Sequence, residues 1–219
     1  MYKLHLTVGA ALVGLFLGAQ SCSAAVVLFD NFDSDALALN WAGDSVFTSI
    51  PAPGNVNGLP STDLVGTIPT DSYGFLCQGH GNCVDLDGST GDGNDPAGQL
   101  VSNNIFGAGT YTLSFLLGGN FRGYGPQTTT VSLGDFLQDI TLNSSDALSL
   151  YLFTFTTTGG ALSFLEQGPS NQQGNILDEV SLSTVPLPAS WTLMLFGLVA
   201  GFAFFHWKGR KEGGSFSAA

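Results

Sequence analysis

The feature that most constrains the fold is a series of short runs rich in Val, Leu, Phe, Tyr and Thr, each followed by Gly, Pro, Asn or Asp. Across residues 26–184 these runs include VVLFDNF, CVDLDG, GTYTLSFLLGG, TTTVSLGDF, DITLNS, LSLYLFTFTTTGG, ALSFLEQG and NILDEVSLS. Runs of this composition are typical of β-strands, and many of them at close spacing favour a sandwich of two sheets. The sequence therefore predicts an all-β fold, a β-sandwich, for residues 26–184.

Two of these runs predict where their strands lie. In TYTLSFL, Tyr111, Leu113 and Phe115 share one face, whereas Thr112 and Ser114 share the other. Alternation of this kind predicts a strand with one buried face. The run LSLYLFTF is apolar on both faces, which predicts a strand in the centre of a sheet.

The N-terminus has the pattern of a secretory signal peptide. Lys3 precedes an apolar run over residues 6–19, and small residues follow up to Ala25. We expect a signal peptide over residues 1–25, with cleavage after Ala24 or Ala25. A lipidated Cys22 is the alternative, although Ala19-Gln20-Ser21 lacks the usual leucine or branched residue before such a cysteine.

Near the C-terminus, residues 190–207 contain no Asp, Glu, Lys or Arg. As a helix these residues span about 27 Å, enough for the hydrocarbon core of a bilayer. Trp191 and Trp207 lie at its margins, and the basic KGRK follows, which predicts a transmembrane helix with its C-terminal end in the cytoplasm. A buried helix of a soluble domain is the alternative. Residues 212–219 form the expected cytoplasmic tail.

Residues 185–211 resemble the PEP-CTERM sorting signal of Gram-negative bacteria. A proline motif, an apolar helix and a basic end follow one another, and the matching positions are Val185, Pro186, Leu187, Pro188, Ala189, Lys208, Arg210 and Lys211. Leu187 stands where that family has glutamate. The resemblance implies export across the inner membrane, processing of the tail by an exosortase, and delivery to the cell envelope, cell surface or extracellular matrix. Without cleavage the helix keeps the protein in the membrane.

Charge is distributed very unevenly along the chain. Of the 17 acidic residues, 16 lie between Asp30 and Glu179, where Arg122 is the one Lys or Arg. Binding to nucleic acid requires cationic side chains against phosphate, so this composition predicts that nucleic acid is not a partner. A solvated acidic surface and a surface that binds divalent cations both remain open.

Once the signal peptide is removed, Cys77 and Cys83 remain as a pair that encloses QGHGN. In an exported protein such a pair predicts a disulfide. A metal site is the alternative, but His80 alone adds too few ligands for a structural zinc.

Four segments resemble galactose-binding-like jelly rolls, the fold of many carbohydrate-binding modules: FDNF, CVDLDGSTG, GTYTLSFLLGGNFRG and NILDEVSL. With period two, Asp30 and Asp178 fall in otherwise apolar rows of the first and last runs, and an unpaired buried carboxylate is costly. If these strands are neighbours, the two acids can share a Ca²⁺ ion. The resemblance implies such an ion, with Asp30 and Asp178 as ligands and, more weakly, Asn31 and Glu179. Acceptance of backbone hydrogen bonds by the two aspartates is the alternative.

The candidate ligand contacts are Arg122 and Tyr124, because a guanidinium and an aromatic ring can frame a sugar; for Arg122, an ion pair with an acid is the alternative. The acidic DLDGSTGDGND segment is a solvated turn or a calcium loop. We find no catalytic motif. We therefore expect a non-catalytic exported protein that associates with exopolysaccharide, with a structural biofilm component or a secreted polysaccharide hydrolase as alternatives.

Overall fold

The structure is a computed structural model that describes residues 23–51, 58, 60–66, 73–89, 97–167, 171–186, 194, 197–199 and 201–202. The chain divides into the unit Ala24–Val185 and a second unit made of Met1–Ser23 and Pro186–Ala219. In the second unit, residues 194, 197–199 and 201–202 are helical. The predicted signal peptide, sorting motif and membrane span fall almost wholly outside the described residues. Within the described part of the chain, no helix has the length and apolar character that crossing a membrane requires.

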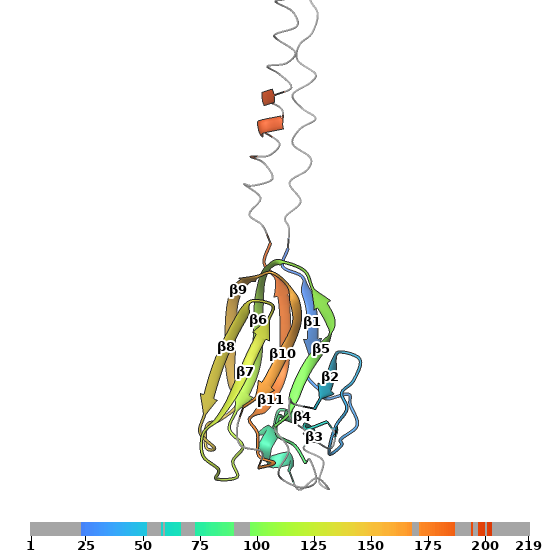
Figure 1. Ribbon diagram of the computed structural model, residues 1–219, viewed down its shortest axis with the longest axis vertical. Helices are drawn as coiled ribbons and strands as arrows, with labels where there is room; N and C mark the ends of the chain where they lie inside the picture. Colours follow the sequence, from blue (N-terminus) through green and yellow to red (C-terminus); the bar gives the residue numbers. More distant parts are fainter. Residues whose placement is uncertain are drawn as a thin grey trace, which may run out of the picture. The chain divides into compact units, whose positions relative to one another are not determined.

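The described residues of Ala24–Val185 form two antiparallel β-sheets (Figure 1). One sheet has the strand order β3-β4-β11-β6-β9, with β1 also paired to β11, and the other has the order β2-β5-β10-β7-β8. The elements are β1 (Val26–Asp30), β2 (Phe47–Ile50), β3 (Asp63–Gly66), the 3-10 helix η2 (Gly74–Cys77), β4 (Asn82–Asp85), β5 (Gln99–Phe106), β6 (Gly109–Gly118), β7 (Gln127–Leu133), β8 (Phe136–Leu142), β9 (Ser149–Thr157), β10 (Gly160–Glu166) and β11 (Ile176–Thr184). The prediction of an all-β sandwich is confirmed.

Aromatic and aliphatic side chains from both sheets fill the space between them. Phe115 of β6 and Phe164 of β10 are fully buried and meet edge to face, with ring centroids 5.2 Å apart. Along β6 the predicted alternation is observed, since Tyr111, Leu113 and Phe115 are buried while the intervening residues are half-exposed. Each fully buried Phe contributes about 2–3 kcal/mol through the apolar area it removes from water, so this core is the main source of stability.

The run LSLYLFTF, apart from its first residue, lies in β9, which is at the edge of its sheet. Tyr151 and Phe153 turn toward the core, whereas Leu150 and Leu152 are 66% and 63% exposed. The prediction of a central strand is therefore wrong. The outward row of β9 is apolar but faces solvent, which a period-two pattern cannot distinguish from burial on both faces.

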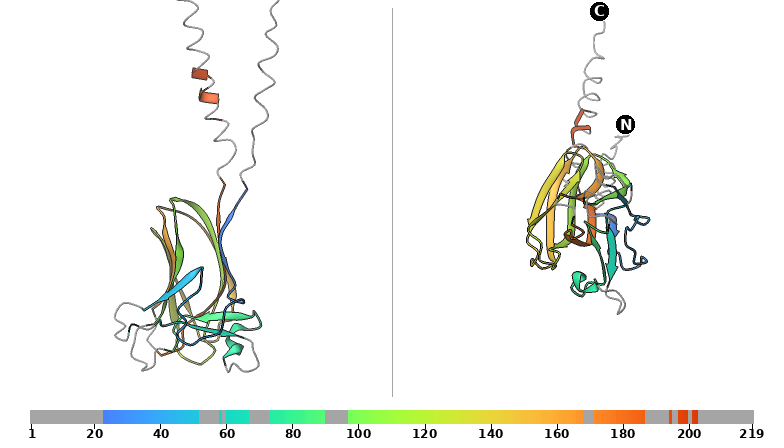
Figure 2. Two further views of the ribbon diagram at one scale, coloured as in Figure 1. Left: turned by 90° about the vertical axis from the view of Figure 1, so that its right-hand side faces the viewer. Right: turned by 60° about the horizontal axis from the view of Figure 1, so that its bottom comes forward.

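Strand β11 lies inside the sheet that contains both the first and the last strand (Figure 2). One edge of β11 pairs with β6, and the other pairs first with β4, through Ile176 and Leu177, and then with β1 from Val180 onward. Asp178 and Glu179 lie where this edge changes partner, and the pairing with β6 is irregular there. The first and last strands, β1 and β11, are thus neighbours. This is the condition under which Asp30 and Asp178 could share an ion.

Different parts of the chain lie at the two ends of the sandwich. Ala25 accepts a hydrogen bond from the backbone N–H of Thr184, and Val185 donates to Thr110 near the start of β6. The far end of β6, at Gly118, leads into the loop before β7. Because a strand rises about 3.3 Å per residue, β6 separates these two ends by about 30 Å.

Candidate functional site

An open pocket lies at the end of the sandwich beyond Gly118. Two loops form it, residues 119–126 between β6 and β7 and residues 143–148 between β8 and β9. Its volume is about 460 Å³, and the residues that line it are Phe121, Gly123, Tyr124, Gly125, Pro126, Asn143, Ser144 and Ser145. That volume lies within the range of small-ligand sites.

Hydrogen bonds between the two loops hold the pocket in shape. The backbone N–H groups of Phe121 and Gly123 donate to the carbonyl oxygen and the hydroxyl oxygen of Ser144, each at 2.8 Å. The Ser144 hydroxyl in turn donates to the side-chain oxygen of Asn120 at 2.8 Å. At Gly119, a Cβ atom would lie 2.1 Å from the carbonyl oxygen of Asn143, so only glycine permits this approach. The pocket is therefore preorganised by its own backbone.

The lining chemistry is aromatic and neutral. Phe121 is 41% exposed and Tyr124 is 51% exposed, so both rings retain a face for a ligand. Among the described residues that line the pocket, Asn143, Ser144 and Ser145 add an amide and two hydroxyls, and there is no carboxylate. Aromatic faces beside amides and hydroxyls match the alternating C–H and O–H surfaces of a sugar ring.

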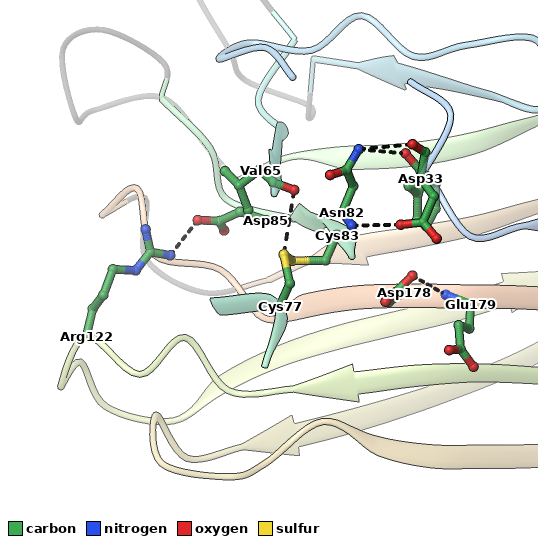
Figure 3. Close-up of a disulfide and its surroundings, with 10 residues drawn as sticks. Asp33, Val65, Cys77, Asn82, Cys83, Asp85, Arg122, Asp178 and Glu179 are labelled. Carbon is green, nitrogen blue, oxygen red and sulfur yellow. Dashed lines mark hydrogen bonds and ion pairs between the residues drawn. A yellow bond between two sulfur atoms is a disulfide. The ribbon is translucent and has the colours of Figure 1, made fainter. Parts of the chain in front are cut away.

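Arg122 lies in the same loop but does not line the pocket. Its Nη2 donates to Oδ2 of the buried Asp85 at 2.5 Å, and its side chain is only 15% exposed (Figure 3). The other carboxylate oxygen of Asp85 accepts from the backbone N–H groups of Asp87 and Gly174. Burial raises the pKa of Asp85 to about 7, and the Arg122 guanidinium opposes that rise. Arg122 therefore acts as the ion-pair partner that fixes the loop.

The segment DLDG, residues 85–88, is built into the interior as a polar network. Asp87 is buried, and its Oδ2 accepts from the backbone N–H groups of Asn171 and Gln173. Residues 90–96 of the predicted turn or calcium loop lie outside the described residues.

Three carboxylates gather beside β1. One oxygen from each of Asp30, Asp35 and Asp44 lies within 4.8 Å of the others. Asp30 is buried, its Oδ1 accepts from the backbone N–H of Phe32 at 2.9 Å, and its Oδ2 has no hydrogen-bond partner. Burial, with the charges of Asp44 and Asp35, raises the pKa of Asp30 to about 7. An all-oxygen set with an unpartnered buried oxygen fits the coordination preference of Ca²⁺.

The other predicted calcium ligands lie elsewhere. Asn31 donates through its amide to Oδ2 of Asp33 at 2.8 Å. Asp178 is fully buried, and burial, with the charges of Glu179, Asp33 and Asp30, raises its pKa. Its carboxylate lies in a different group of candidate ligands, which it forms with Glu179 and His80. Of the predicted set, Asp30 lies in one group of candidate ligands and Asp178 and Glu179 lie in another, whereas Asn31 lies in neither. Asp35 and Asp44 were missed, because they lie in an irregular segment where periodicity assigns no face.

The sulfur atoms of Cys77 and Cys83 are bonded, and the Cα atoms are 5.5 Å apart (Figure 3). The loop they close is anchored to the segment after β1, since the backbone N–H of Asn82 donates to Oδ1 of Asp33. Next to it, a Cβ at Gly81 would lie 1.9 Å from the same Asp33 oxygen, and its φ is +84°. The left-handed φ therefore favours glycine where the disulfide loop meets Asp33, in the segment after β1.

Glu166, at the end of β10, is also a buried acid. Its Oε2 accepts from the hydroxyl of Thr129 and the backbone N–H of Asn175, and burial raises its pKa to about 8. Glu166 therefore joins β7, β10 and the segment before β11.

The described unit is thus an all-β sandwich with an open aromatic pocket at one end. No protein-family model matches the sequence, and a search of curated proteins found no match. Among solved structures, the K3 cleaved adhesin domain of Lys-gingipain from Porphyromonas gingivalis W83 matches 74% of this chain and 100% of its own, at 16% identity and a TM-score of 0.49. The CBM22-1 xylan-binding domain of Xyn10C from Paenibacillus barcinonensis matches 76% of this chain and 98% of its own, at 10% identity and a TM-score of 0.42. Likenesses of this degree say nothing about the ligand or activity of this chain.

Proposed function

We propose that the chain is a non-catalytic carbohydrate-binding protein of the cell surface or extracellular matrix, and that the pocket at 119–126 and 143–148 holds the glycan. The observation that carries this proposal is the pair of exposed rings, Phe121 and Tyr124, beside hydroxyl and amide groups in a preorganised pocket. Such a pocket offers stacking and hydrogen bonds without a catalytic acid among its described lining residues.

The position of the pocket supports a role in display. The pocket lies at one end of the sandwich, and Ala25 and Thr184 lie at the other, about 30 Å away along β6. A protein held through the segment after Thr184 therefore has its pocket at the end remote from that attachment. We take the exopolysaccharide of the producing cell as the ligand class, because the sequence resemblance of residues 185–211 implies a surface address.

Replacing Tyr124 with Ala is expected to weaken glycan binding by up to about tenfold, because a stacked ring contributes about 0.5–1.5 kcal/mol beyond its buried area, and about 1.4 kcal/mol is a factor of ten in affinity. Binding is measured with the full chain, in calcium, on a glycan array and by pull-down with the producer's own exopolysaccharide. Phe75→Ala is the matched control, since Phe75 is an exposed ring outside the pocket. No binding by the unmodified protein in either assay rejects the proposed function.

We also propose that the sandwich is a galactose-binding-like jelly roll stabilised by calcium. The pairing of the first and last strands supports this. So do the three carboxylates of Asp30, Asp35 and Asp44, whose oxygens are the hard ligands that Ca²⁺ takes.

We also propose how the protein reaches the cell surface. Residues 1–25 direct export, and 185–211 act as a PEP-CTERM sorting signal that an exosortase cleaves, with residues 190–207 in the membrane before cleavage. The support is the order of proline motif, apolar helix and basic end. We expect mass spectrometry of the mature protein to find a C-terminus near Pro188. A C-terminus at Ala219 means that the tail is a permanent anchor instead.

A further inference from the structure

A second group of metal-ligating side chains lies where β11 changes its pairing partner. A ring nitrogen of His80, one oxygen of Asp178 and one oxygen of Glu179 lie within 4.8 Å of one another. His80 comes from the disulfide loop, and the two acids are consecutive in β11. The group therefore joins residues about 100 positions apart in the sequence, and it includes a nitrogen donor that the three-carboxylate cluster lacks.

The burial of Asp178 indicates that this group binds a ligand. It is fully buried, and its Oδ1 accepts from the backbone N–H of Glu179 at 2.7 Å. Its Oδ2 is also buried and has no hydrogen-bond partner. Burial raises the pKa of Asp178 to about 7. A buried carboxylate oxygen without a partner is costly, and a cation removes that cost.

The spacing of the other two groups suits a small tetrahedral ion. Nδ1 of His80 and Oε1 of Glu179 are 3.4 Å apart. In a tetrahedral zinc site with bonds of about 2.0–2.1 Å, neighbouring ligand atoms are about 3.3 Å apart. Imidazole nitrogen is a common ligand of Zn²⁺, whereas Ca²⁺ prefers oxygen throughout.

Solvent reaches the same place. The side chains of His80 and Glu179 are 42% and 50% exposed, while Asp178 beside them is fully buried. An ion can therefore enter from solvent, bind the buried carboxylate and keep water as its fourth ligand. As a simple surface pair, His80 and Glu179 would add little stability, and Oδ2 of Asp178 would stay without a partner.

The fold holds both sides of the group. The backbone N–H of His80 donates to the carbonyl of Cys77 at 2.9 Å, inside the loop that the disulfide closes. Glu179 has φ +49°, in the left-handed region, at the point where β11 leaves β4 and meets β1. The disulfide thus sets the position of the histidine, and the change of partner sets that of the two acids.

We propose that His80, Asp178 and Glu179 form a Zn²⁺ site with one position open to water, and that the Cys77–Cys83 loop presents its histidine. The site is distinct from the Asp30, Asp35 and Asp44 cluster in both donor type and ion.

Titration calorimetry with ZnCl₂ tests this on the full chain in a nonionic detergent, after treatment with a chelator. We expect one Zn²⁺ per chain with a Kd below 10 μM, and His80→Ala weakens that binding at least tenfold. The substitution is at an exposed position, so the fold is retained. His206→Ala is the matched control and leaves binding unchanged. Replacement of Zn²⁺ by Co²⁺ should give the intense visible absorption of a four-coordinate site, and His80→Ala should remove it.

Two further variants sharpen the test. Asp178→Asn keeps the Oδ1 acceptor but loses the charge, and we expect it to weaken zinc binding by a similar factor. The double variant Cys77→Ser/Cys83→Ser is expected to weaken it less, because it frees the loop but removes no ligand. The proposal fails if the unmodified chain binds zinc with a Kd above about 10 μM, or if His80→Ala binds it as tightly as the unmodified chain.

Discussion

Removal of calcium at pH 7.5 is expected to lower the melting temperature of the full chain by roughly 5–10 °C. An ion that binds only the folded state at 100 times its Kd stabilises that state by about 2.7 kcal/mol. For a domain of this size, 1 kcal/mol corresponds to roughly 2–4 °C. Without the ion, Asp30, Asp35 and Asp44 repel one another around a buried, unpartnered oxygen. The measurement is a melt of chelated protein with and without added CaCl₂.

The effect of calcium should depend on pH in a defined direction. The pKa of Asp30 is raised to about 7 in the folded state, so the folded state binds more protons than the unfolded state between about pH 4 and 7. In the absence of calcium, stability from this group is present at low pH and is lost as the pH rises through 7. Calcium replaces the proton, so the stabilisation by calcium is largest above pH 7 and disappears near pH 4.

Two isosteric variants identify the ligands. Asp30→Asn keeps the acceptor for the Phe32 N–H but removes one charge, so it should raise the melting temperature without calcium and abolish the response to it. Asp178→Asn is the matched control, because it neutralises another buried acid with a pKa of about 7 outside the three-carboxylate cluster. A melt that calcium leaves unchanged rejects the site, and a response lost in Asp178→Asn but kept in Asp30→Asn would move it to β11.

Replacing Arg122 with Met is expected to cost about 3 kcal/mol of unfolding free energy, measured by chemical denaturation at pH 7.5. Removal of one partner from a buried ion pair leaves the other charge uncompensated, and such losses are typically about 3–5 kcal/mol. Here the carboxylate left without its partner is that of Asp85, which is 2% exposed. The substitution should also disturb the shape of the pocket, because Arg122 lies between Phe121 and Gly123, which line it.

The double variant Asp85→Asn/Arg122→Met separates charge from packing. Asparagine retains the oxygen that accepts from Asp87 and Gly174, so the double variant should recover most of the loss. The deficit of the single variant should also shrink as the pH falls below about 7, because folded Asp85, whose pKa is raised to about 7, then takes up a proton and is no longer an uncompensated charge. A loss of less than 1 kcal/mol at pH 7.5 would mean that Asp85 does not depend on the guanidinium.

The all-β class could be predicted because period-two alternation and short apolar runs are typical of strands. In β6 every second residue from Tyr111 to Phe115 is buried, as the pattern requires. In β9 the same reasoning failed, since Leu150 and Leu152 are apolar and yet exposed at a sheet edge. Sequence periodicity reports which side chains share a face, but whether that face is covered depends on strand order.

The candidate sites could be predicted only in part, for a related reason. Period-two reasoning placed Asp30 and Asp178 in apolar rows, and both are buried. Their partners depend on loops: Asp35 and Asp44 come from the connection between β1 and β2, and His80 comes from the disulfide loop. The pocket likewise joins two loops about 20 residues apart. A local sequence pattern cannot predict such contacts, because they depend on how the fold brings distant loops together.

The placement of β11 has a mechanical consequence. A pull applied through the segment after Thr184 acts along β11, which is hydrogen-bonded on one edge to β6 and on the other to β4 and β1. Force along that axis must shear both ladders together, whereas a pull on the two chain ends in opposite directions would open the β1–β11 pair one hydrogen bond at a time. A surface protein tethered at its C-terminal side would therefore resist drag in the direction in which the fold is strongest.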